Sequence, residues 1–146
     1  MLSTEWLQLF NLMHRLHRSA HRRARESAGP GEVEYTSTQI GALHAISTRP
    51  EWRMSDLSKR LRVSAGSLTT MINRLIEAGL VERSRSTEDR RVVTVRLTEA
   101  GKELLAEGQR RWTRGLEEIL SQLSEEDRAR LDNALRTATE ILLQIT

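Results

Sequence analysis

The sequence predicts a mostly helical protein with a small β-hairpin, which is an α+β fold class. Six segments repeat apolar residues at helical spacing, and two short runs rich in β-forming residues follow one another near the middle. The 146 residues, 38% hydrophobic and 29% charged, are enough to form a core without crosslinks. The chain has no cysteine, which excludes a disulfide scaffold, a cysteine nucleophile, a thiolate zinc site and a thiol redox switch.

The first predicted helix runs from Trp6 to Arg25 and ends at the glycine and proline residues of segment 28–31. Apolar residues surround its first turns on almost every side, which indicates burial from several directions. A small monomer could hardly bury a terminal helix in this way, whereas a second subunit could. The sequence therefore predicts an oligomer.

Three shorter helices are expected next. Thr36 and Gln39 have the spacing of a capping box at the start of the second helix, and the third covers residues 54–62. Ser64 is placed to cap the fourth, and Gly79 falls where a left-handed residue ends a helix. The apolar stripe of the fourth helix consists of Leu68, Ile72, Leu75 and Ile76.

Residues 80–84 and 92–97 are expected to pair as the hairpin, with the charged segment 85–91 between them. Thr98 is placed to cap a long helix and Ser124 to cap a final one, and both helices carry apolar stripes.

This order of elements over residues 36–98 predicts a winged helix-turn-helix, in which the second helix of the turn enters the major groove of DNA. We expect an N-terminal dimerisation helix with a linker (1–34), a winged helix-turn-helix DNA-binding domain (35–98) and C-terminal dimerisation helices (99–146). Residues 49–96 carry eleven basic and six acidic side chains, whereas the flanking segments are near neutral or acidic. A basic middle third favours a polyanionic partner.

Candidate DNA contacts lie on the fourth helix and at the hairpin tip. Opposite the apolar stripe, the fourth helix shows small and hydroxyl residues together with Asn73 and Arg74, whose side chains can reach base edges or phosphates. At the tip, an arginine can enter a narrow minor groove while an aspartate orients its guanidinium. Taken alone, such a tip is also typical of a solvated loop, but the preceding helix-turn-helix pattern favours DNA contact.

Residues 54–64, residues 73–83 and, above all, Asp89-Arg90-Arg91 leading into Val95-Arg96-Leu97-Thr98-Glu99-Ala100-Gly101 carry a family resemblance. The chain is similar, over nearly its whole length, to the MarR family of transcriptional regulators. The resemblance implies a homodimer whose two winged modules bind successive turns of a palindromic site in double-stranded DNA.

The family pattern, carried onto this sequence, implies contacts from the fourth helix and from the wing. The implied contact residues are Ser64, Ser67, Thr69, Thr70, Asn73, Arg74, Arg83, Asp89, Arg90 and Arg91. Arg83 would meet phosphate and Arg91 the minor groove, while Asp89 would orient Arg91 or pair with Arg74. Thr70 departs from the family, in which a basic residue is common at this position.

Similar proteins usually repress transcription and release DNA when a small molecule, often an aromatic acid, binds. The resemblance therefore implies a small-molecule effector, and the lack of cysteine excludes the family's peroxide-sensing chemistry. Aromatic and imidazole side chains are the candidates for lining its pocket, namely His14, His17, His44, Trp52 and Trp112. Trp112 lies on an apolar helix stripe, which favours dimer core as its role.

Three imidazoles, those of His14, His17 and His21, share one face of the first helix. Two of them could form a zinc clip, with a third ligand from His44 or a glutamate, and a zinc-sensing branch of the family exists. The alternatives are a polar or interfacial stripe, which the neighbouring arginines favour because they would repel a cation, and a pH response through packed histidines.

Other classes of function receive less support. Neither a glycine-rich phosphate loop nor a nucleophile–histidine–acid spacing is evident, so we expect no enzyme and no cofactor. A winged helix can also bind a protein partner, but the arginine-rich wing favours DNA. The sequence lacks an apolar run of about 18 residues and a signal-peptide pattern, which predicts a cytoplasmic protein without a membrane partner.

Overall fold

The computed structural model describes residues 4–26, 35–85 and 92–145. The chain divides into two compact units. We call Gly29–Gln109 the winged-helix unit, and Met1–Ala28 together with Arg110–Thr146 the helical unit. Within the described residues, no helix is both long enough and apolar enough to cross a membrane.

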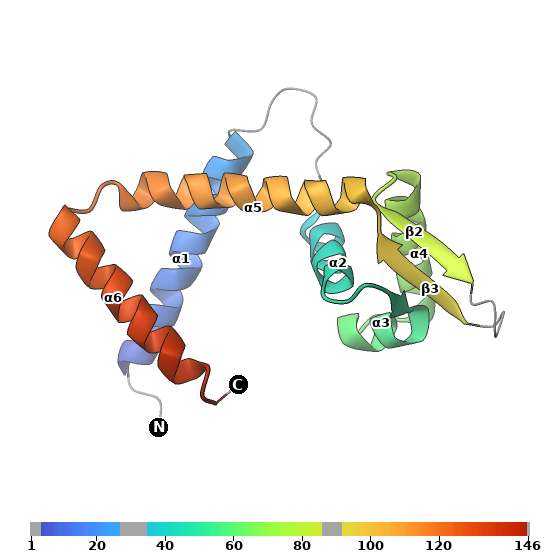
Figure 1. The fold of residues 1–146 in the computed structure, drawn as a ribbon, viewed down its shortest axis with the longest axis horizontal. Coiled ribbons are helices and arrows are strands. Elements are labelled where there is room, and N and C mark those ends of the chain that lie inside the picture. Colours follow the sequence, from blue (N-terminus) through green and yellow to red (C-terminus); the bar gives the residue numbers. More distant parts are fainter. Residues whose placement is uncertain (1–3, 27–34, 86–91, 146) are drawn as a thin grey trace. The chain divides into compact units, whose positions relative to one another are not determined.

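The winged-helix unit contains three helices, a small sheet and the beginning of a long helix (Figure 1). Its elements are α2 (Ser37–Ser47), β1 (Trp52–Arg53), α3 (Met54–Leu61), α4 (Ala65–Glu77), β2 (Val81–Arg85), β3 (Val93–Leu97) and the first part of α5 (Glu99–Leu120). The strands pair antiparallel in the order β1-β3-β2, with Arg83 opposite Val95. The predicted fold class is confirmed.

The structure adds one strand that the sequence did not predict. In β1, Trp52 lies opposite Val95 and Arg53 lies opposite Thr94 of β3. Two residues are too few for an alternating pattern to be visible in a sequence. The expected hairpin is therefore two strands of a three-stranded sheet.

The apolar stripes expected for the helices meet in the core of the winged-helix unit. The largest side chains with under 2% exposure are Leu43, Ile46, Leu57, Leu68, Ile72, Leu75, Val81 and Val95. They come from α2, α3, α4 and both long strands, so the core fixes α4 against the sheet. Truncating a buried leucine here to alanine would cost about 2–5 kcal/mol of stability.

The predicted caps are present. Thr36 and Gln39 form a reciprocal capping box at α2. The Oγ of Ser64 accepts the Ser67 N–H at 3.1 Å and starts α4. Gly79 takes a left-handed φ of 72° directly after α4, as expected for a residue without a Cβ.

The junction between the sheet and α5 is a close backbone approach. The Oγ1 of Thr98 accepts the Gly101 N–H at 3.1 Å and donates to the Gly79 carbonyl at 2.6 Å. A Cβ added to Gly101 would lie 2.1 Å from the Leu80 carbonyl oxygen, a distance that no side chain tolerates. Gly101 is therefore required for α5 to begin against the end of α4 and the start of β2.

The helical unit comprises α1 (Thr4–Glu26), the remainder of α5 and α6 (Glu125–Leu142). Helices α1 and α5 meet at two small residues, because a Cβ on Gly115 would lie 2.7 Å from the Ala20 carbonyl oxygen. Next to this contact, Arg23 Nη1 and Glu118 Oε2 form an ion pair at 3.1 Å.

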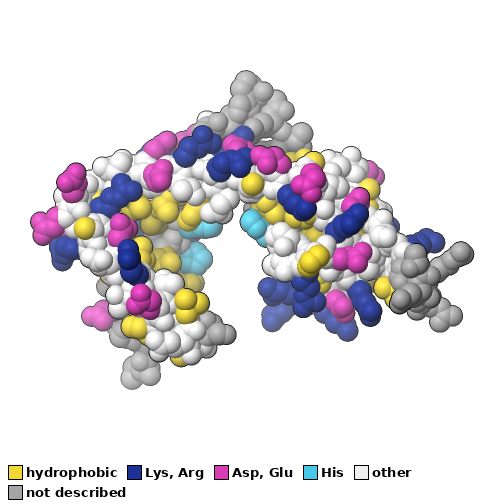
Figure 2. All heavy atoms as spheres, viewed as in Figure 1, with side chains coloured by type: hydrophobic (Ala, Val, Ile, Leu, Met, Phe, Trp, Pro, Cys, Tyr) yellow, Lys and Arg dark blue, Asp and Glu magenta, His cyan; other side chains and the backbone are white. Residues whose placement is uncertain are grey.

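Large apolar side chains of the helical unit remain at the surface (Figure 2). They are Trp6, Leu7, Leu9, Phe10, Leu12, Met13, Leu123, Leu135, Ile141, Leu142, Leu143 and Ile145, with 40–77% exposure. Of the described residues in this unit, Ala20 and Gly115 alone are buried. Within a single chain, the described part of the helical unit therefore has almost no core of its own.

Candidate nucleic-acid interface

The exposed face of α4 carries the hydroxyl residues that the sequence singled out. Ser64 and Ser67 are exposed and joined by a hydroxyl–hydroxyl hydrogen bond of 2.9 Å. Thr69 donates to the Ala65 carbonyl at 2.9 Å, and Thr70 donates to the Gly66 carbonyl at 3.2 Å. Both threonine residues are exposed.

The direction of these hydrogen bonds decides what the threonines can recognise. A hydroxyl whose proton is donated to its own helix can still accept a hydrogen bond. In the major groove, the donors available are the exocyclic amines of cytosine and adenine. In this conformation Thr69 and Thr70 are suited to those amines and not to phosphate oxygens, which are acceptors only.

A hydrogen bond joins α4 to the wing. Arg83 Nη2 of β2 donates to Oδ1 of Asn73 on α4 at 3.1 Å, and both residues are exposed. The amide group of Asn73 and the remaining N–H groups of Arg83 stay available to a ligand. Both residues were expected as DNA contacts from the sequence. Their hydrogen bond to each other could not be predicted, because it depends on how α4 packs against β2.

Two other cations of this surface, Arg74 and Arg85, differ from Arg83 in their contacts. Within the described part of the chain, Arg74 of α4 and Arg85 of β2 form no ion pair. Asp89, Arg90 and Arg91 at the expected wing tip lie outside the described residues, so their roles stay predictions. Unpaired cations beside α4 produce a positive potential that favours an anionic partner.

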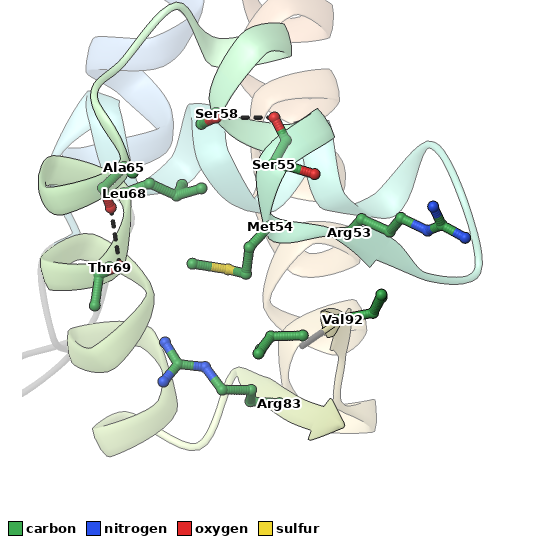
Figure 3. A pocket seen from close by; sticks show the side chains of 10 residues that line it. Arg53, Met54, Ser55, Ser58, Ala65, Leu68, Thr69, Arg83 and Val92 are labelled. Carbon is green, nitrogen blue, oxygen red and sulfur yellow. Dashed lines mark hydrogen bonds between the residues drawn. The ribbon is translucent and has the colours of Figure 1, made fainter. Parts of the chain in front are cut away.

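A pocket of about 450 Å³ opens on the same side of the winged-helix unit (Figure 3). Its lining residues are Arg53, Met54, Ser55, Ser58, Ala65, Leu68, Thr69, Arg83, Val92 and Val93. They combine an apolar floor with two guanidinium groups and three hydroxyls. Thr69 and Arg83 thus belong both to the pocket and to the expected DNA contacts.

The five residues proposed for an effector pocket do not gather within either unit. His14, His17 and Trp112 belong to the helical unit, whereas His44 and Trp52 belong to the winged-helix unit. His44 is exposed on α2. Trp52 is 4% exposed within the core, and Arg49 stacks over its ring at 4.1 Å. A ligand could reach the Trp52 ring only by opening that core.

The histidine face of α1 forms ring contacts. His14 packs edge-on against Phe10 at 4.3 Å between ring centroids, and His17 packs against His21 at 4.4 Å. The ring of Trp112 lies 5.8 Å from His17 and 6.4 Å from His21. Partial burial, then His17, then Arg25 lower the pKa of His21 below its ordinary 6.5.

These contacts leave the zinc proposal without an assembled site. Over the residues that the structure describes, no three His, Asp or Glu side chains are grouped so that they could hold a metal ion. His14, His17 and His21 make ring contacts instead, which fits the alternative of an interfacial stripe.

Comparisons with known proteins agree with this geometry. A model of the MarR family matches residues 35–93. The multiple antibiotic resistance protein MarR of Escherichia coli (strain K12) is 33% identical over 100 residues, which cover 68% of either chain. The matches to curated Bacillus subtilis regulators span about half of those proteins, 52%.

Two solved structures share the fold. The transcriptional regulator Tm0710 from Thermotoga maritima superposes with a TM-score of 0.80 at 20% identity, over 97% of this chain and 96% of that one. A mutant MarR from E. coli complexed with operator DNA superposes with a TM-score of 0.55 at 28% identity, over 94% and 98%.

The three-stranded sheet, the α3–α4 pair and the polar face of α4 define a winged helix-turn-helix transcriptional regulator. The chain belongs to the MarR family, whose members are regulators of transcription and not enzymes.

Proposed function

We propose that the protein is a homodimeric, sequence-specific DNA-binding regulator, most directly a repressor that a small molecule releases from a palindromic operator. The hydrogen bond between Asn73 and Arg83 is the observation that carries this proposal. It joins the recognition helix α4 to the wing strand β2 in one polar, cationic surface. Such a surface can place α4 in the major groove while the wing follows the phosphate backbone.

The helical unit supports the dimer. Its exposed apolar residues come from α1, from α6 and from the segments that follow α5 and α6. Burying one such side chain contributes about 1.5–3 kcal/mol. In an isologous contact the same residues are buried on both copies, so each contributes once per subunit. The two-fold symmetry of such a dimer fits a palindromic site, and the dimer fits the oligomer predicted from the first helix.

The pocket on the DNA-facing side supports an effector. Its apolar floor suits a small planar ring, and Arg83 suits a carboxylate or phenolate. A molecule bound there would occupy Arg83 and cover Thr69. It would therefore compete with DNA for the same groups, which accounts for release without any movement of the two units.

The test is fluorescence anisotropy of the purified protein on the duplex upstream of its own gene, beside a scrambled duplex, at roughly 50–200 mM salt. We expect preference for the upstream duplex, steep salt dependence and two chains per site. Arg83→Ala should weaken binding by about 1–3 kcal/mol. Arg128→Ala on α6 is the control, because Arg128 is an exposed arginine of the helical unit.

Equal binding to both duplexes over the whole salt range would contradict sequence-specific recognition. Loss of binding in Arg128→Ala as large as in Arg83→Ala would contradict the assignment of the interface to α4 and β2.

A further inference from the structure

The C-terminal end of α3 carries three cations that the sequence analysis did not assign. They are Lys59, Arg60 and Arg62, and all three are exposed. Within the described residues none of them forms an ion pair, whereas Arg96, on the sheet, pairs with Glu82. Figure 2 shows Lys and Arg side chains gathered along this edge of the winged-helix unit.

Helical spacing places one of the three cations, Lys59, on the side that α3 turns toward the DNA-facing pocket. Ser55 and Ser58 line that pocket together with Thr69 and Arg83 (Figure 3). At about 100° per residue, Lys59 falls about 40° from Ser55. Arg62 is the cap residue directly after α3, so both cations follow these serines toward the turn that leads into α4.

Arg60 occupies another side of α3. The same count places it about 140° from Ser55 and about 100° from Lys59. Arg60 and Lys59, both exposed, thus lie on different sides of α3.

The backbone of Arg62 supplies an independent observation. Arg62 takes φ 55° and ψ 42°, and among the described residues it is the single non-glycine residue with positive φ. Glycine adopts this left-handed conformation without the steric cost that a Cβ imposes. An arginine at a position that glycine would fill more favourably indicates that its side chain has a use.

We propose that Lys59 and Arg62 bind the phosphate backbone of DNA beside the groove that receives α4. This inference rests on the proposed function and extends the interface from α4 and the wing to the end of α3. Arg62 supplies a planar, permanently charged donor, and Lys59 supplies a second charge one turn before it. The contact is to phosphate, so it adds affinity at every sequence and positions α4 without reading bases.

The test compares four variants by anisotropy on the duplex that the wild type prefers, across a salt series. Arg62→Gly removes the guanidinium and fits the backbone, and Lys59→Ala removes the other charge. Arg62→Lys keeps a charge at the same position. Arg60→Ala is the matched control, since it removes an exposed arginine from another side of the same helix end.

We expect Arg62→Gly to lower affinity about fivefold to tenfold per protomer near 0.1 M salt and to reduce the log–log salt slope by about 0.9 per protomer. Lys59→Ala should act in the same direction, and Arg62→Lys should keep the wild-type slope. The ratio of affinities for preferred and scrambled duplexes should not change. Arg60→Ala should bind like the wild type.

A stability measurement separates loss of contact from loss of fold. Arg62→Gly should unfold at a higher urea concentration than the wild type, because it relieves the left-handed arginine. Weaker DNA binding by a more stable protein cannot be explained by misfolding. A lower urea midpoint would overturn the argument from the backbone.

The outcomes distinguish this inference from the proposed function. Suppose that the wild type prefers its duplex and that Arg62→Gly has the wild-type affinity and salt slope. The proposed phosphate contact at the end of α3 is then wrong, whereas the proposed function as a sequence-specific regulator is retained. An effect of Arg60→Ala equal to that of Arg62→Gly would also overturn the proposed phosphate contact. If the wild type shows no preference at all, both fail together.

Discussion

At the scale of single residues, two glycines of α5 show how one atom can decide local structure. Gly101 lies against the backbone of Leu80, where a Cβ would be 2.1 Å from the carbonyl oxygen. Gly108, two turns later, has nothing within 4 Å of the same added atom. The sequence presents both simply as glycines within a helical pattern.

Replacing each glycine by alanine should therefore change stability in opposite directions. Gly101→Ala should lower the free energy of unfolding by about 1–3 kcal/mol, because backbone must shift to admit the methyl group. Gly108→Ala should raise it by about 0.5–1 kcal/mol through helix propensity. Urea denaturation followed by far-UV circular dichroism measures both, and equal effects would contradict the close approach at Leu80.

The same scale shows where sequence reasoning succeeded. The cap residues Thr36, Ser64 and Ser124, and the left-handed Gly79, were predicted because their signals are local. Arg62 was placed inside a helix and not at its left-handed end, since a positive φ on arginine has no sequence signature.

At the scale of elements, the hydrogen bond between α4 and β2 would couple recognition to the wing in the proposed DNA interface. Asn73 accepts a hydrogen bond from the Arg83 guanidinium, and this bond would restrict how Arg83 approaches DNA. Fixing a charged side chain before binding reduces the ordering cost on association.

A double-mutant cycle measures this coupling. Asn73→Ala and Arg83→Ala should each weaken DNA binding, and the double variant should lose less than the sum of the two, by about 0.5–1.5 kcal/mol. Anisotropy at fixed salt gives the four affinities. Losses that simply add would mean that the two side chains act independently and that the hydrogen bond has no role in binding.

We expect the contact between α1 and α5 to respond to pH through His21. Its pKa is lowered by partial burial, by His17 and by Arg25, and the ring of Trp112 on α5 lies 6.4 Å from its ring. The unfolded chain therefore binds a proton more readily than the folded one, and stability falls as the pH decreases. The loss begins near the unfolded value of 6.5 and ends below the lowered folded pKa.

We expect the free energy of unfolding to be constant above about pH 7.5 and lower at about pH 5.5, and His21→Gln to reduce that difference. Urea denaturation at both pH values, compared between wild type and variant, provides the measurement. An unchanged difference in the variant would show that His21 is not the responsible group.

Element packing also marks the limit of the sequence analysis. The apolar stripes of α2, α3 and α4 were predicted because a helix buried on one side repeats its apolar residues with the helical period. Strand β1 is too short for a period, and Trp52, proposed for a ligand pocket, lies in the core because β1 pairs with β3. Only the three-dimensional register shows which aromatic residue is enclosed.

At the scale of the whole molecule, the proposed dimer would cover the exposed apolar residues of the helical unit. Leu12 of α1 is 55% exposed and belongs to a run of apolar residues along the first turns. Within a single chain, the described residues offer it no core.

Leu12→Glu should therefore weaken self-association while leaving the winged-helix unit folded. Burying an unpaired carboxylate instead of leucine costs several kcal/mol, so we expect the dimer Kd to rise about a hundredfold or more. Gln109→Glu, an exposed change in the winged-helix unit, is the control. Analytical ultracentrifugation that finds a 16.7 kDa monomer for the wild type would contradict the dimer.

The central claim is that a dimer of this chain reads a palindromic DNA sequence. The most direct measurement is selection of bound duplexes from a random pool by the full-length protein. We predict enrichment of one palindrome whose half-sites lie one helical turn apart, about 10–10.5 base pairs between centres, or a multiple of that spacing. Recovery of duplexes with no shared sequence after repeated rounds would contradict it.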